Sequence, residues 1–295
     1  MSDFVLSCSS PADLSVEYYK ERDIRMIPFH FMLGSEWYLD DCGQTIPYGE
    51  FFGRMAKGEM TKTSQINVEE YEEYFEKILK EGKDILHLSL SSGISGTYNS
   101  ARIAMDTLRE KYPDRKIYVE DSLAASSGFG LLMDKLADLR DEGKSIDELR
   151  DFVDKNKRRL NHWFFTTDLT YLIRGGRVSK ASGMIGQAFN ICPLLNVDVD
   201  GKLMARSKHR GKKRVIRAAA DKVLSLIDDR ENYTGKIFIS NAQCFEDAKE
   251  VSNILEAALP RMNGPVQHFS IGNLIGSHTG PGTVAIFFWG DERVD

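Results

Sequence analysis

The sequence predicts an α/β fold divided into two domains. Its 295 residues are about twice the roughly 150 expected of one domain. Short apolar runs rich in β-branched residues alternate with amphipathic helical patterns along most of the chain, which is typical of strands alternating with helices. After Leu160 an apolar stretch leads into a glycine-rich turn. We therefore expect an N-terminal α/β domain at residues 1–160 and a C-terminal α/β domain at residues 161–295.

Strands and helices alternate in the first half. The expected strands are residues 4–6, 26–33, 85–90 and 117–120. Residues 68–81 place their apolar side chains on one helical face and are followed by Gly82, which favours a helix that ends there. The next helix runs from about Asn99 to Lys111 and stops before Pro113. This order of strand, loop, helix and strand predicts a parallel βαβ unit.

Capping residues and apolar runs predict the remaining elements. Helices are expected at 128–142, 146–160, 212–227 and 245–259, and strands at 236–240 and 284–289. Ser145, followed three residues later by Glu148, favours a capped helix start. Residues 198–201 are expected to form a hairpin-like turn. The hydroxyl-rich segment 61–65 and the glycine-rich segment 271–282 are expected to be loops.

Composition excludes several classes of protein. The longest apolar run, residues 284–289, is far shorter than the ~20 residues of a membrane span. The first residues lack the pattern of a secretory signal, so we expect a cytoplasmic protein. Four scattered cysteines show neither disulfide nor zinc spacing, and no metal is expected. A net charge of −5 gives no overall attraction for nucleic acid, although residues 206–217 form a local basic segment.

The loop at residues 90–101 carries the strongest signal for a binding site. It follows a predicted strand, opens a predicted helix and contains Ser95, Gly96 and Thr97. Free backbone N–H groups, a helix dipole and hydroxyls suit a phosphate or a carboxylate. The loop matches neither a Walker motif nor a nucleophile elbow, because Thr97 stands where the elbow has glycine. A capped helix with structural glycines is an equally good interpretation of this segment alone.

Four further segments could contribute to a site, and each has a structural alternative. The hydroxyls of residues 61–65 could serve only as helix caps. Asp121 and Ser122 could cap the following helix or lie at a crevice. The glycines of residues 174–179 explain a tight turn by themselves. His278, within a glycine-rich segment, could be a base, a donor to an anion or a structural histidine.

Taken together, these segments resemble the DegV family of bacterial fatty-acid-binding proteins. The resemblance covers nearly the whole chain and rests on Thr63-Ser64-Gln65, Ser91-Ser92 with Ser95-Gly96-Thr97-Tyr98, Asp121-Ser122, Gly175-Gly176-Arg177-Val178-Ser179 and Gly276-Ser277-His278-Thr279-Gly280-Pro281-Gly282. It implies a two-domain DegV-like α/β fold that holds one long-chain fatty acid between the domains. It also implies that a fatty acid kinase subunit receives the carboxylate and makes acyl phosphate for phospholipid synthesis.

The resemblance also implies roles for particular residues. The fatty-acid carboxylate is expected on Thr63 and Ser95, with help from the backbone at Gly96 and from His278. Neighbouring residues that match the same motifs are Ser64 and Thr97, and possible supporting residues are Asp121, Ser122, Arg177 and Ser179. Arg210 aligns with an arginine that docks the kinase. The expected protein is a carrier with no catalytic residues, no cofactor beyond its fatty acid, no nucleic-acid partner and at most transient membrane contact.

The sequence departs from the family pattern at a few positions. Cys8 replaces an acidic residue, and Cys192 replaces the lysine before Pro193. We expect fatty-acid binding to survive and the preferred chain length to shift. Three rival hypotheses remain: a serine hydrolase that uses Ser95 and His278, a phosphate or anion-binding protein, and a protein-interaction or DNA-contacting module built on residues 206–217.

Overall fold

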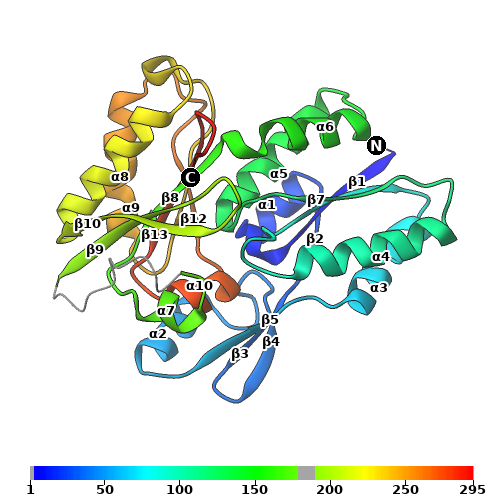
Figure 1. Cartoon of the computed structure of the whole chain (residues 1–295), viewed down its shortest axis with the longest axis horizontal. Coiled ribbons are helices and arrows are strands. Elements are labelled where there is room, and N and C mark those ends of the chain that lie inside the picture. Colours follow the sequence, from blue (N-terminus) through cyan, green and yellow to red (C-terminus); the bar gives the residue numbers. More distant parts are fainter. Residues whose placement is uncertain (1–2, 179–189, 295) are drawn as a thin grey trace.

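The computed structural model describes residues 3–178 and 190–294 and has the mixed α/β architecture that the sequence predicts (Figure 1). Its first sheet is parallel, with strand order β2-β1-β6-β7. These strands are β1 (Phe4–Ser9), β2 (Ile24–Ile27), β6 (Asp84–Ser89) and β7 (Ile117–Asp121). One face packs against α3 (Val68–Lys80) and α4 (Thr97–Lys111), and the other against α1 (Val16–Glu21), α5 (Ser126–Asp141) and α6 (Ile146–Asn156). The predicted βαβ unit is confirmed.

The second sheet has six strands in the order β10-β9-β8-β13-β11-β12. They are β8 (Leu160–Phe165), β9 (Ile191–Val197), β10 (Leu203–Arg210), β11 (Phe238–Asn241), β12 (Gln267–Ser270) and β13 (Val284–Trp289). All neighbours are antiparallel except β11 and β12. Helices α8 (Lys212–Leu226) and α9 (Phe245–Ala258) cover one face, and α5 packs against the other. Helix α5 therefore lies between the two sheets, which explains why it is buried on nearly all sides.

A small antiparallel sheet, ordered β4-β3-β5, completes the fold. It consists of β3 (His30–Leu33), β4 (Glu36–Leu39) and β5 (Thr61–Ser64). Around it lie α2 (Tyr48–Ala56), α7 (Thr170–Gly175) and α10 (Asn273–Thr279). Because α7 and α10 come from the second half of the sequence and pack beside strands from the first half, the division at residues 160 and 161 stays a prediction.

Four local predictions were wrong, and each has a physical reason. Residues 26–33 form two strands in different sheets, β2 and β3, because Pro28 follows the last residue paired with β1. Residues 61–64 form β5, since pairing with β3 overrides their weak apolar pattern. The 271–282 loop contains helix α10. Helix α6 ends at Asn156, and a 3-10 turn at Lys157–Arg159 leads into β8.

Two further 3-10 turns occur at Ser10–Ala12 and Arg230–Asn232. The turn predicted at residues 198–201 joins β9 to β10, with Gly201 at a φ of 74°. All four cysteines are free. Among the described helices, none combines the length and apolar character that crossing a membrane requires.

Candidate functional site

The candidate site lies between the inner face of the six-stranded sheet, the start of α5 and helix α10. A cavity there is lined mainly by apolar side chains: Ile94, Ala125, Phe164, Val197, Leu203, Ile271, Ile275, Ala285 and Phe287, together with Ser126, His162, Arg177, His278, Thr279 and Thr283. Side chains alternate along β8, so His162 and Phe164 face this cavity while Trp163 faces α8. The cavity volume is about 70 Å³.

His278 lines this cavity and contacts Thr63, although 215 positions separate the two residues in the sequence. The Oγ1 atom of Thr63, on β5, lies 2.8 Å from Nε2 of His278, on α10. Burial and the nearby positive charge of Arg177 lower the pKa of His278 to about 4, so the imidazole is neutral at pH 7. The Nδ1 atom of His278 is buried without a hydrogen-bond partner among the described residues. This pair can hydrogen-bond an anionic head group without placing a second full charge beside it.

Gly175 fixes the position of the His278 ring. A Cβ atom at residue 175 would lie 2.6 Å from His278 Nδ1, which is far inside van der Waals contact. Gly175 ends α7, and Gly176 follows it in the left-handed conformation with φ 68°. The glycine pair predicted as a tight turn therefore serves two purposes. Gly176 adopts the left-handed conformation that terminates α7, and Gly175 leaves room for the His278 ring.

The loop that carries Ser95 is held by the other half of the molecule. The hydroxyl of Ser91 donates to the carbonyl of Gly201 at 2.8 Å. A Cβ atom on Gly93 would lie 2.7 Å from the carbonyl oxygen of Asp200, so this approach requires glycine. The Ser95 Oγ accepts a 3.3 Å hydrogen bond from the N–H of Thr97, and Gly96 immediately precedes α4. Ser95 thus lies at a helix N-terminus, beside the cavity residue Ile94.

Several predicted residues point away from the Thr63–His278 pair. The hydroxyl of Thr97 is buried 2.9 Å from the Tyr71 hydroxyl. Ser64 is exposed, and alternation along β5 directs it to the face opposite Thr63. Asp121 accepts hydrogen bonds from the N–H groups of Ser92 and Leu123, so it shapes two loops.

The remaining predicted residues also have clear positions. Among the described residues, the hydroxyl of Ser122 bonds only with the backbone of Ala124. Arg177 is exposed, lines the cavity and donates to the carbonyl of Gly175. Ser179 lies outside the described residues. Arg210, at the end of β10, is exposed and lies in a basic hollow with the first residues of α8, which includes neither Thr63 nor His278.

Sequence reasoning missed two cavity residues, His162 and Ser126, and the carboxyl group of Asp13 beside Ser126. His162 is buried, and neither ring nitrogen has a partner that meets hydrogen-bond geometry among the described residues. Ser126 has a φ of 55°, unusual for a residue other than glycine, and donates to Asp13 Oδ2 at 2.5 Å. Burial raises the pKa of Asp13 well above its ordinary value. Only alternation within residues 160–165 could have indicated the side on which His162 lies.

The rival hydrolase requires a hydrogen bond between Ser95 and His278. In the structure, Ser95 accepts from Thr97 and the Nε2 atom of His278 pairs with Thr63. Burial in β1 raises the pKa of the Cys8 thiol, where the family pattern has an acid. Within residues 3–178 and 190–294, no three His, Cys, Asp or Glu side chains gather in a way that could hold a metal ion.

Comparison with known proteins identifies the family. Residues 7–291 match the model of the DegV family. A DegV domain-containing protein of Clostridium perfringens is 36% identical over 293 residues, which cover 99% of each chain. A Thermotoga maritima structure described as revealing a fatty-acid-binding function has 26% identity and a TM-score of 0.80, and the match covers 97% of this chain and 99% of that one. The Streptococcus pneumoniae fatty acid kinase B3 protein loaded with linoleic acid shares the fold, with 22% identity, a TM-score of 0.83 and coverage of 98% and 99%. This chain therefore belongs to the DegV family.

Proposed function

We propose that this protein binds one long-chain fatty acid non-covalently, with the carboxylate at Thr63, Ser95 and His278 and the tail in the cavity between the six-stranded sheet, the start of α5 and α10. The observation that carries the proposal is the Thr63–His278 pair at an apolar cavity. The Thermotoga maritima relative named above, described as a fatty-acid-binding protein, supports it.

The head-group site stabilises a carboxylate through neutral donors. Hydroxyl groups and an uncharged imidazole provide hydrogen bonds that are strengthened by the charge of the acceptor. The N-terminus of α4, a 15-residue helix that begins at Thr97, adds a favourable dipole near Ser95. Arg177 supplies a positive charge at the exposed edge of the cavity. These groups suit a carboxylate that is still reachable from outside.

The tail supplies most of the binding free energy. Each methylene transferred from water to an apolar site contributes about 0.8 kcal/mol, so a C16 tail contributes on the order of 10 kcal/mol before ordering costs. Spreading a cavity of about 70 Å³ offsets part of that gain. We therefore expect tight binding that depends on chain length.

We further propose that a fatty acid kinase subunit phosphorylates the bound carboxylate, so that the protein serves phospholipid synthesis as a carrier. Arg210 and the exposed basic residues at the start of α8 suit electrostatic docking of an acidic partner surface. With kinase and ATP, the loaded protein should yield acyl phosphate, trapped as a hydroxamate. Formation of acyl phosphate by the loaded protein alone, or turnover of an ester that is lost in Ser95→Ala, would contradict the carrier assignment.

Binding itself is tested by displacement of a fluorescent fatty acid. Thr63→Ala and His278→Ala should each raise the Kd roughly tenfold, because each removes a hydrogen bond to a charged group. Thr107→Ala is the matched control, since Thr107 is exposed on α4 and bonds only to Ile103 among the described residues. Unchanged affinity in Thr63→Ala and His278→Ala would refute this head-group site.

A further inference from the structure

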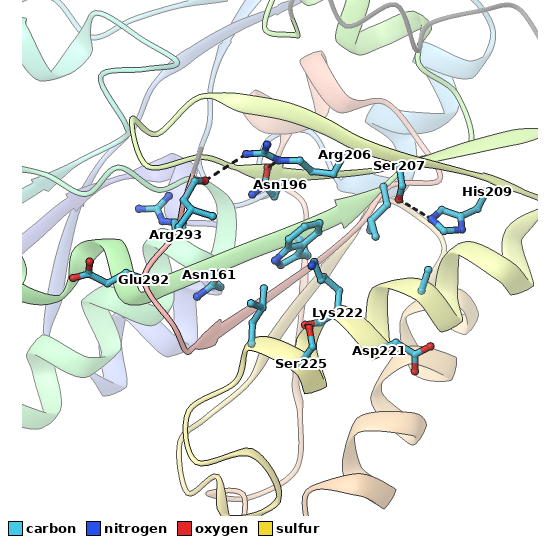
Figure 2. A pocket seen from close by; sticks show the side chains of 15 residues that line it. Asn161, Asn196, Arg206, Ser207, His209, Asp221, Lys222, Ser225, Glu292 and Arg293 are labelled. Atoms are coloured by element: carbon cyan, nitrogen blue, oxygen red, sulfur yellow. Dashed lines mark hydrogen bonds between the residues drawn. The ribbon is translucent and has the colours of Figure 1, made fainter.

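A second cavity, of about 630 Å³, lies on the opposite face of the six-stranded sheet (Figure 2). Helix α8 forms one wall, strands β8 to β10 form the floor and the segment 292–294 forms the far edge. Trp163 projects to this side of β8, whereas its neighbours His162 and Phe164 project into the fatty-acid cavity. The volume falls in the range of small-molecule sites, roughly 300 to 1,000 Å³. The function proposed above uses none of its residues.

Three cations from three separate elements line this cavity. Arg206 comes from β10, Lys222 from α8 and Arg293 from the C-terminal segment. Within the described part of the chain, none of them forms an ion pair with a carboxylate. Lys222 Nζ lies 5.1 Å from the centre of the Trp163 ring, and Figure 2 shows its side chain reaching from α8 toward the sheet. Lys222 is thus held in place without a counter-ion.

Arg206 is also positioned by neutral groups. Its Nε donates to the Oδ1 atom of Asn196 at 2.7 Å, and one terminal nitrogen lies 3.5 Å from the Val294 carbonyl. The other terminal nitrogen, NH1, has no hydrogen-bond partner within residues 3–178 and 190–294. Beside Arg206, the Ser207 hydroxyl lies 2.8 Å from His209 Nε2. Burial lowers the pKa of His209, so this pair adds polar groups and no charge at pH 7.

Arg293 adds a buried positive charge beside this cavity. Only 5% of the residue is exposed. Its terminal nitrogens donate to the carbonyls of Leu123, Asp198 and Lys157. The Nε atom has no partner among the described residues. Burial lowers the pKa of Arg293 to about 10, although the nearby carboxylates of Asp198 and Asp121 favour its charged form. An anion in the cavity would add to their stabilisation of this buried cation.

Two carboxylates also line the cavity, and neither neutralises these cations. Asp221 is paired with Arg217, whose Nε lies 2.9 Å from its Oδ1. Glu292 is exposed at the edge. Donors on β10 and on α8 line different walls of the cavity, an arrangement that suits the tetrahedral oxygens of a phosphate group better than the planar pair of a carboxylate. The remaining volume and the Trp163–Lys222 floor leave room for an organic substituent.

We propose that this cavity binds a small organic phosphate, with its phosphate group held by Arg206, Lys222 and Ser207 near Arg293. The site is separate from the fatty-acid cavity, so the two proposals can fail independently. Calorimetric titration of the full chain with phenyl phosphate and with inorganic phosphate should show saturable binding of at least one. Tighter binding of phenyl phosphate would indicate that the ligand is an organic phosphate. Equal binding of the two probes would indicate that the same side chains hold inorganic phosphate.

Matched variants separate a specific site from general charge attraction. Lys222→Met and Arg206→Gln should each raise the Kd at least about tenfold, whereas Lys222→Arg, which keeps the positive charge, should weaken binding less than Lys222→Met. Lys249→Gln removes the same charge from the exposed face of α9, outside the cavity, and should leave the Kd unchanged. Fatty-acid loading and the melting temperature verify the fold of each variant. The proposal is overturned if neither probe saturates, or if Lys249→Gln weakens binding as much as Lys222→Met.

Discussion

Gly175→Ala tests whether the position of His278 determines fatty-acid affinity. The new Cβ would lie 2.6 Å from His278 Nδ1 and 3.3 Å from Cγ, so the ring cannot keep its present position against Thr63. Losing one hydrogen bond to a carboxylate weakens binding by about 1.5 to 3 kcal/mol, which raises the Kd by a factor of roughly 10 to 150. Displacement of a fluorescent fatty acid measures this change directly.

Stability should change less than affinity in this variant. Overpacking costs about 1 to 3 kcal/mol, while replacing glycine by alanine in a helix gains up to about 1 kcal/mol. Gly53→Ala is the matched control, because its Cβ would meet nothing within 4 Å. We expect Gly53→Ala to keep wild-type affinity and to raise the melting temperature slightly. A Gly175→Ala protein with wild-type affinity would refute the assigned role of His278.

Three further predictions concern charge and docking. The pKa of His278 is about 4 in the folded protein against 6.5 ordinarily. The free energy of unfolding should therefore fall as the pH drops from about 6.5 to 4. Denaturant titrations should show a smaller fall in His278→Gln. Lys236→Met should cost about 2 kcal/mol of stability, because Asp134 is 1% exposed and loses a partner 2.6 Å away; an equal loss in Lys202→Met, a surface pair, would contradict this reason. Arg210→Ala should slow kinase-dependent acyl phosphate formation severalfold, and a displacement titration should find its fatty-acid affinity unchanged. A rate equal to that of the wild-type protein would remove Arg210 from the docking surface.

Local sequence signals predicted the elements whose caps and apolar runs lie within or next to the element itself. The helix beginning at Val68 has a complete capping box between Asn67 and Glu70, and residues 284–289 form β13 as expected. The failures occur where distant pairing decides the structure. Residues 61–64 become a strand only because β3 lies beside them, and no local pattern indicates that partner.

The candidate site shows the same difference between local sequence signals and contacts between distant segments. The Ser95 loop was visible because its glycines and hydroxyls lie together in the sequence. The contact between Thr63 and His278 depends on how β5 and α10 pack, across 215 positions, so only the family resemblance could suggest it. The phosphate cavity had no sequence signal beyond the basic segment 206–217, since Trp163, Lys222 and Arg293 come from separate elements.

Denaturing extraction of the purified protein, followed by mass spectrometry of the released lipid, tests the central claim most directly. The proposed carrier function predicts about one long-chain fatty acid per chain in the wild-type protein and a clear loss in His278→Ala, whose fold is verified by its melting temperature. A wild-type protein that releases no fatty acid and also fails to bind added fatty acid would contradict the carrier function.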